Sequence, residues 1–422
     1  MVSEAIHPLR IRDYRLIWLT RFLSVNATVA VVVIIGAQVY QYARTVEGMA
    51  PKEAAFLLGL LGLAQFIPFL LLTPVAGLLA DRLDRRFVAA ASTAVDLGIA
   101  LTLALANTFE FLSLPLLFAL AACHGGARVF IGPSVSAIIP NVVPAESLPR
   151  AVAFSSIAWQ SGSVIGPAVA GFLLARDPAM PYWYAAALLA VGMVTVLMIR
   201  PIPIPPKSEL HPVRQMAEGA QFVWRERFLL GCVTLDLFAV LLGGATAMLP
   251  AFAYDVLHVG DEGLGLMRGA PGVGAALVAL WLGFRPMHRN VGEKMLWAVA
   301  VYGGATLTFG LSTSFVLSLS MLALLGAADQ VSVFIRSTLI QLNTPDDKRG
   351  RVSSISGLAI SASNELGEMQ SGLAAALLGP VWAVALGGAG AIVVTAIWTV
   401  IFPELRRAKT FAPQYRQKEQ VR

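Results

Sequence analysis

Residues 77–86 read Gly77-Leu78-Leu79-Ala80-Asp81-Arg82-Leu83-Asp84-Arg85-Arg86, and they separate two long apolar runs of the chain. The first run covers residues 54–79 and the second covers residues 87–106. Each run is long enough to cross a bilayer, since a spanning helix needs about 20 apolar residues. A turn with five charges between two spans must lie at a membrane face, and its three arginines place it on the cytoplasmic side.

The composition is that of an integral membrane protein. Of the 422 residues, 57% are hydrophobic and only 13% are charged, whereas soluble domains carry about 25% charged residues. The net charge of +6 comes from basic residues scattered through short loops, so we exclude a nucleic-acid-binding protein. The sequence has no phosphate-binding glycine loop and no metal-ligand spacing, and we therefore expect no ATP drive, no cofactor and no metal.

Hydropathy divides the chain into twelve candidate spans. In the first half they cover residues 16–40, 54–79, 87–107, 112–139, 150–174 and 182–200, and in the second half 228–254, 264–284, 294–312, 314–342, 352–378 and 381–402. Residues 201–227 lie between the halves, begin with four prolines that stop a helix, and include an amphipathic stretch at 216–224. We predict an all-α membrane protein with two pseudo-symmetric six-helix bundles, residues 1–200 and 228–422, joined by a cytoplasmic linker.

The distribution of basic residues predicts the orientation of these spans. With both termini inside, the cytoplasmic segments hold 24 lysines and arginines, and the outer loops hold three. An excess of this size decides the topology by the positive-inside rule. We expect a multi-pass protein of a bacterial cytoplasmic membrane, with both termini and a C-terminal tail in the cytoplasm.

The turn at residues 77–86 resembles the signature loop between the second and third spans of the major facilitator superfamily. The matching residues are Gly77, Leu79, Asp81, Arg82, Arg85 and Arg86. Asp84 stands where that family usually has glycine, and the form with this aspartate is similar to the branch of enterobactin and macrolide exporters. The resemblance implies the twelve-helix fold and a conformational-switch role for this motif, with Asp81 near residues 350–354 in the outward-facing state.

A second motif lies in the predicted fifth span. Residues 162–171, Gly162-Ser163-Val164-Ile165-Gly166-Pro167-Ala168-Val169-Ala170-Gly171, resemble the antiporter motif of the same superfamily, with Ala170 replacing one glycine. Small residues let two helices approach closely, and a proline bends a helix, so we expect a close crossing at Gly162 and Gly166 and a kink at Pro167. The resemblance favours export over uptake, although a plain packing face would use the same glycines, including Gly171.

Charged residues inside the spans are candidates for energy coupling, because they are costly in a bilayer. Arg128 and Asp96 lie at similar depths in spans 4 and 3, about 16 and 14 Å from the inner ends. Arg128 is also followed four residues later by Gly132, which resembles a family motif linked to proton transfer. The two side chains are close enough in depth to pair, either as a fixed structural pair or in proton coupling.

The second half contains a denser charged set. Glu365 and Glu368 are three residues apart and share one helix face. Asp329 falls near the depth of Glu365, Arg268 near that of Glu368, and Asp236 lies shallower. Desolvation favours the neutral form of a carboxylic acid, which makes such groups proton carriers, and we favour Glu365. The alternative is a structural network with Arg268 and Asn364.

Together these features predict a monomeric secondary transporter that exports an amphiphilic small molecule, a drug or siderophore, in exchange for protons. Asn26, Trp159 and Phe238 are candidates for the wall of its substrate cavity. A lysophospholipid flippase of the same superfamily and a non-transporting membrane sensor remain alternatives. A membrane enzyme is not expected, because the five histidines are scattered and form no metal cluster.

Overall fold

The computed structural model describes residues 7–201, 212–285, 287, 289–345 and 348–411, and within them it contains helices and no strands. Its long helices are α1 (Arg12–Thr45), α2 (Pro51–Arg82), α3 (Arg85–Thr108), α4 (Leu114–Val142), α5 (Leu148–Leu174), α6 (Met180–Leu197), α8 (Arg227–Leu242), α10 (Gly260–Phe284), α11 (Val291–Leu311), α12 (Phe315–Leu342), α13 (Arg349–Leu378) and α14 (Pro380–Ile401). The shorter elements are η1 (Pro8–Arg10), η2 (Ala145–Ser147), α7 (Pro212–Arg225), η3 (Ala245–Met248), α9 (Leu249–Ala251), η4 (Phe252–Val256) and α15 (Pro403–Arg407). The fold class predicted from the sequence is confirmed.

The long helices coincide with the predicted spans. In the described part of the chain, ten segments are long and apolar enough to cross a membrane, and one of them runs from α8 to the end of η4. The two remaining predicted spans correspond to α11 and α13. Helix α13 is the more polar of these because it carries Glu365 and Glu368 in its middle. The predicted helix of the linker is present as α7, whereas its position on the membrane surface stays a prediction.

Proline and glycine mark the helix ends. Proline stands in the first turn of α4, α5, α6 and α14, where its missing N–H has no intrahelical acceptor to lose. Gly379 joins α13 to α14 with a φ of 89°, a conformation that a residue with a Cβ rarely adopts. These local signals define two neighbouring long helices with a one-residue connection.

The chain forms two compact units. Unit 1 comprises Met1–Met49, Ala64–Glu209 and Val259–Gly269, and unit 2 comprises Ala50–Leu63, Leu210–His258 and Ala270–Arg422. The predicted boundaries at residues 200 and 228 therefore remain a prediction, because residues 50–63 and 259–269 group differently from the rest of their halves. In unit 1, α1 packs against α5 and α6, and α3 packs against α4 and α6.

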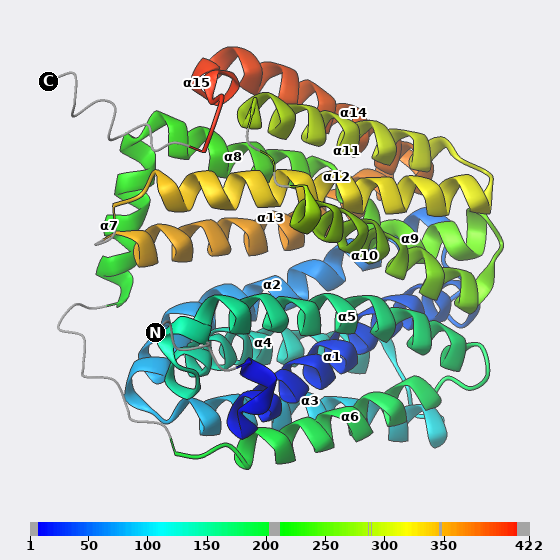
Figure 1. The fold of residues 1–422 in the computed structure, drawn as a ribbon. Helices are drawn as coiled ribbons and strands as arrows, with labels where there is room; N and C mark the ends of the chain where they lie inside the picture. Colours follow the sequence, from blue (N-terminus) through cyan, green and yellow to red (C-terminus); the bar gives the residue numbers. More distant parts are fainter. Residues whose placement is uncertain (1–6, 202–211, 286, 288, 346–347, 412–422) are drawn as a thin grey trace, which may run out of the picture. The chain divides into compact units, whose positions relative to one another are not determined.

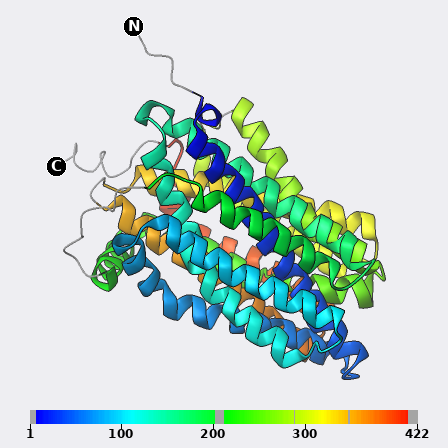
Figure 2. The ribbon, with the colours of Figure 1, turned by 90° about the horizontal axis from the view of Figure 1, so that it is seen from below.

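The helices of each unit run lengthwise beside one another. Figure 1 and the view turned by 90° in Figure 2 both show α1 extending along the whole of its neighbours in unit 1. In unit 2, α11 packs against α12 and α14, and α13 packs against α8 and α14. The core of this unit includes Leu235, Met295, Ile335 and Val394, all less than 9% exposed. Lengthwise packing brings polar residues from different helices to the same depth.

The predicted seventh span is discontinuous. Helix α8 ends at Leu242, and the chain continues through Gly243 and Gly244 into η3, α9 and η4. Two adjacent glycines and Pro250 weaken a regular helix here, because glycine loses the most backbone entropy and proline lacks a donor. The sequence gives a continuous apolar run, but the structure ends its hydrogen-bond ladder near the middle of the span.

Candidate functional site

The glycines of the fifth span form a close crossing with α1 in unit 1. A Cβ on Gly162 would stand 3.0 Å from the backbone N of Asn26, and one on Gly166 would stand 2.3 Å from the Asn26 carbonyl oxygen. Asn26 is 2% exposed, and its Oδ1 accepts a hydrogen bond of 2.8 Å from the Tyr184 hydroxyl. The predicted crossing is therefore present, whereas the antiport role of the motif stays a prediction.

The motif extends this packing toward the end of α5. Pro167 lies inside the helix, and a Cβ on Gly171 would stand 2.6 Å from the Cα of Gly265 in the part of α10 that belongs to unit 1. Beside this contact, the Gln41 Nε2 donates a 3.0 Å hydrogen bond to Asp261 Oδ1. Glycine at both positions lets the two backbones touch, which a side chain on either helix would prevent.

The charged turn between α2 and α3 is organised by Asp84. This residue is the N-cap of α3 with a φ of −61°, and its carboxylate accepts from the Arg86 backbone N at 3.0 Å and from the Arg86 guanidinium at 2.6 Å. Arg86 also donates to the Ile199 carbonyl at 2.6 Å, just beyond the end of α6. Because φ is negative, this turn does not require the glycine that the family usually has here.

The Arg86 hydrogen bonds also affect the titration of this turn. They hold the pKa of the Asp84 carboxyl below its ordinary value of 3.8, because they stabilise its charged form. Arg85 lies in the first turn of α3. The side chains of Asp81 and Arg82 and the surroundings of Gly77 are outside the described residues, and so is any contact between Asp81 and residues 350–354.

A buried acid in unit 1 pairs with a histidine. Asp96 of α3 is 3% exposed, and its Oδ1 lies 2.8 Å from Nδ1 of His124 in α4, which is 4% exposed. One turn further along α4, the Arg128 guanidinium lies over the ring of Phe69 at 5.1 Å from the centroid. The structure thus shows His124 as a direct partner of Asp96, where the sequence analysis considered Arg128.

A second buried group lies in unit 2. Asp236 of α8 forms an ion pair with Arg336 of α12, and their side chains are 8% and 4% exposed. Asp329 stands seven residues before Arg336 on the same face of α12 and interacts electrostatically with both of the paired residues. This cluster, Asp236–Arg336–Asp329, combines two carboxylates with one guanidinium inside a bundle of membrane-spanning helices.

The break after α8 lies next to this cluster. The Tyr302 hydroxyl of α11 donates a 3.0 Å hydrogen bond to the Gly243 carbonyl, and Tyr302 also interacts electrostatically with Asp236 and Asp329. A Cβ on Gly244 would stand 2.7 Å from the Ser371 Oγ of α13. Discontinuous helices are where transporters expose backbone groups to ions and substrates, and this break is held between α11 and α13.

The two glutamates of α13 lie in unit 2. Glu365 is 6% exposed. Glu368 packs against a glycine of α2, since a Cβ on Gly62 would stand 2.8 Å from the Glu368 Cβ and 3.0 Å from its Oε2. One turn along, a Cβ on Gly59 would stand 2.7 Å from the Gly372 Cα. Glu368 therefore lies at a close contact between α13 and the first part of α2.

Comparison with known proteins assigns the chain to a family. The family model described as Major Facilitator Superfamily matches residues 17–368, which is most of the chain. The chain belongs to the major facilitator superfamily. The predicted resemblance is thereby confirmed, and the multi-pass membrane location follows from this membership together with the ten membrane-spanning candidates.

Relatives of this superfamily member include named exporters. It is 26% identical over 405 residues to the enterobactin exporter EntS of Escherichia coli O1:K1 / APEC, covering 95% of this chain and 94% of the relative. A POT family transporter in complex with 5-aminolevulinic acid has a TM-score of 0.75 at 12% identity, covering 94% of this chain and 97% of that one. A bacterial homologue of the human lysosomal transporter Spinster has a TM-score of 0.65 at 18% identity, covering 94% and 96%. The solved structures support the fold alone.

The remaining candidate residues from the sequence analysis lie in both units. Arg268 lies in the part of α10 that belongs to unit 1, and Glu368 lies in unit 2. Trp159 is 46% exposed in unit 1, and Phe238 is 38% exposed in unit 2, where its ring contacts that of Trp398 at 5.3 Å. Asn26 is instead enclosed in the α1–α5 crossing, which makes it a packing residue in this structure. Its role in a cavity wall remains untested, like those of the two aromatic residues.

Three residues of these sites were missed by the sequence analysis: His124, Tyr302 and Arg336. An arginine within a span needs a counter-charge, so the seven-residue spacing between Asp329 and Arg336 was a usable signal. His124 precedes Arg128 by four residues and so shares its helix face, which was a second signal. Tyr302 had no such signal, because its partner is a backbone carbonyl. Among the described residues, no group of three or more His, Cys, Asp and Glu side chains is arranged to hold a metal ion.

Proposed function

We propose that this superfamily member is a proton-driven exporter of an amphiphilic small molecule across a bacterial cytoplasmic membrane. The observation that carries the proton-coupling part is the Asp236–Arg336–Asp329 cluster of unit 2, in which a buried ion pair of Asp236 and Arg336 lies near the partly buried Asp329. The substrate part rests on the similarity to the enterobactin exporter EntS, which favours a siderophore or a drug of similar character. The antiporter-like motif at residues 162–171 favours export.

The charge balance of the cluster gives it a proton-binding capacity. Two carboxylates and one guanidinium carry one uncompensated negative charge when both acids are ionised, and such a charge is unfavourable in a partly desolvated place between helices. Binding one proton removes that charge. Because Asp236 is in direct contact with Arg336, we assign the exchangeable proton to Asp329. Loading from the acidic outer side and release to the cytoplasm would then drive substrate outward.

The break after α8 supports a coupling role for this cluster. Tyr302 donates a hydrogen bond to the Gly243 carbonyl and lies within electrostatic range of Asp236 and Asp329, so the cluster and the discontinuity are neighbours in unit 2. The discontinuity in turn contacts α13 through Gly244. Glu365, which is buried on α13, is the second candidate for the proton carrier.

The proposal is tested in proteoliposomes with an imposed pH gradient. Enterobactin, a macrolide and lysophosphatidylethanolamine serve as the transported probes. Asp329→Asn keeps the size of the side chain and removes its proton exchange, so uphill transport of the probe should fall to the level of empty vesicles. Exchange of the probe without a gradient should persist, because it needs no net proton movement. Glu365→Gln is measured in parallel, and Glu47→Gln, an exposed carboxylate in the loop after α1, is the matched control.

Each result of this experiment is informative. If Asp329→Asn transports the probe uphill at the wild-type rate, Asp329 is not the proton carrier. If only Glu365→Gln loses uphill transport, Glu365 is the proton carrier. If neither variant loses uphill transport, coupling by these acids is wrong. Movement of the lysolipid without a gradient, with no transport of the other two probes, would favour the flippase alternative.

A further inference from the structure

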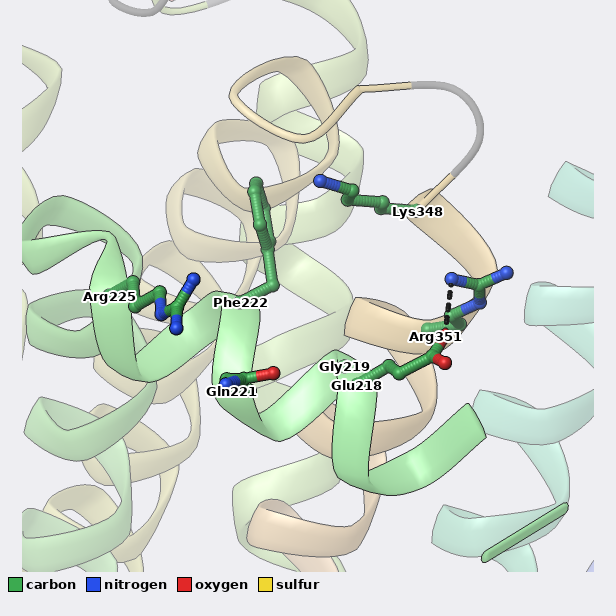
Figure 3. A pocket seen from close by; sticks show the side chains of 7 residues that line it. All are labelled: Glu218, Gly219, Gln221, Phe222, Arg225, Lys348 and Arg351. Carbon is green, nitrogen blue, oxygen red and sulfur yellow. Dashed lines mark hydrogen bonds and ion pairs between the residues drawn. The ribbon is translucent and has the colours of Figure 1, made fainter. Parts of the chain in front are cut away.

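Unit 2 contains a cationic cavity between the linker helix α7 and the start of α13. The cavity has a volume of about 250 Å³ and is lined by Glu218, Gly219, Gln221, Phe222, Arg225, Lys348 and Arg351. Figure 3 shows its three cationic side chains around Phe222, with Lys348 at the ring, Arg225 on α7 and Arg351 beside Glu218. Three cations and one carboxylate leave a net charge of +2 in this small space.

The two helices that form the cavity are in close contact. A Cβ on Gly219 would stand 2.8 Å from the Arg351 carbonyl oxygen, so the backbones of α7 and α13 touch at this point. The Glu218 Oε2 lies 2.8 Å from the Arg351 Nη1, and the Lys348 Nζ lies 4.6 Å from the Phe222 ring centroid. Glu218 therefore neutralises Arg351, whereas Lys348 rests on an aromatic ring.

Two of the cations lack a carboxylate partner within the described residues. No ion pair of Arg225 or Lys348 with a described acidic residue is present, and both contribute to the cavity wall. Lys348 also precedes the first residue of α13, where the unpaired N–H groups of a helix start add positive potential. The cavity thus has two cations available for an external anion, together with a favourable backbone field.

The exposed side chains of α7 indicate where that anion comes from. Val223 is 4% exposed and packs in the core of unit 2, whereas Trp224 is 75% exposed on the adjacent position. A helix with one face anchored to the protein and an exposed tryptophan beside an arginine is typical of the membrane interface, where tryptophan is enriched. Basic pockets at the cytoplasmic ends of spans bind the head groups of anionic lipids.

We propose that this cavity binds the phosphate of an anionic phospholipid, and that the head group clamps the linker helix to α13. The phosphate lies between Arg225 of α7 and Lys348 of α13, and so bridges the two helices at the point opposite the Glu218–Arg351 ion pair. The cavity has room for a phosphate with part of its glycerol. This assignment is independent of the transported substrate and of the coupling ion.

The test is native mass spectrometry of the full-length protein in detergent, titrated with dioleoyl phosphatidylglycerol. Dioleoyl phosphatidylcholine, whose zwitterionic head group has no net charge, is the reference lipid. One cation near a lipid head group contributes about five-fold in affinity, the equivalent of about 1 kcal/mol. Arg225→Gln and Lys348→Gln should each raise the Kd for phosphatidylglycerol by about that factor. The matched control is Arg406→Gln, an exposed arginine of α15 in the same unit, which should leave the Kd unchanged.

Further variants separate binding from misfolding. Lys348→Arg retains the charge and should restore the wild-type Kd, and Glu218→Gln should lower the Kd because it removes the carboxylate that competes for Arg351. Equal Kd values for Arg225→Gln, Lys348→Gln and Arg406→Gln would overturn the proposal, as would equal affinity for both lipids. Displacement of the lipid by inorganic phosphate at equal concentration would assign the cavity to a soluble anion and overturn the lipid assignment.

Discussion

Replacing Gly166 by alanine tests the α1–α5 crossing directly. The new Cβ would stand 2.3 Å from the Asn26 carbonyl oxygen, 3.1 Å from its carbonyl carbon and 3.3 Å from its Cα. All three neighbours are backbone atoms, so no side chain can rotate away. Because ordinary contact begins at 3.4 Å, the two helices must separate by about 1 Å at this point.

The size of the effect follows from two opposing terms. Overpacking of a tight contact costs about 1–3 kcal/mol, and the backbone neighbours place Gly166→Ala at the upper end. Alanine recovers about 0.8–1.0 kcal/mol through its higher helix propensity. The expected net loss in the free energy of unfolding is about 2 kcal/mol. Gly162→Ala, whose nearest atoms are at 3.0 Å, should be close to neutral.

The assay is reversible unfolding of the purified protein by SDS in mixed micelles, followed by circular dichroism. The matched control is Gly98→Ala in α3 of the same unit, where a Cβ would meet no atom within 4 Å and alanine should stabilise the helix. The predicted order of stability is Gly98→Ala, then Gly162→Ala, then Gly166→Ala. Equal stability of Gly166→Ala and Gly98→Ala would refute the close crossing.

Two other predictions concern the turn between α2 and α3 and the topology. Since the pKa of Asp84 is lowered below 3.8 in the folded state, its ion pair stabilises the protein above about pH 4 and is lost as the pH falls further. Asp84→Asn, which keeps the cap oxygen, should flatten the dependence of the melting temperature on pH in this acidic range, and an unchanged dependence would contradict the assigned pair. Single cysteines at Ser208 and Glu262, in a variant without Cys123 and Cys232, should be labelled by an impermeant thiol reagent from inside and outside, respectively. Labelling of the cysteine at position 208 from outside intact cells would refute the predicted orientation.

The all-helical membrane fold was predictable because the bilayer imposes a local rule. A segment that crosses lipid must be a helix of about 20 apolar residues, and the charged turns between such segments are visible in the sequence. For that reason the ends of α3 and α12 fall within a few residues of the predicted spans. The resemblance to the family followed from short motifs in one turn and two helices, which depend on residues close together in the chain.

The side-chain partners were less predictable, since they depend on which helices pack together and at what rotation. Depth along the helix suggested Arg128 for Asp96, but His124 lies one turn away on the same face of α4, so depth alone does not choose between them. The structure pairs Asp96 with His124. Similarly, the sequence analysis did not single out Arg336. The packing of α8 and α12 turns it toward Asp236.

Hydropathy and local motifs were enough to predict the all-helical fold, the approximate limits of its long helices, the linker helix and the glycines that permit a close crossing. Only helix packing brings Gly166 against Asn26, breaks the predicted seventh span after α8, and places Lys348 and Arg351 beside α7. The physical reason is the range of the interactions involved. Hydropathy and backbone conformation act within a few residues, whereas ion pairs and backbone contacts form between helices that are distant in the chain and are fixed only when those helices pack.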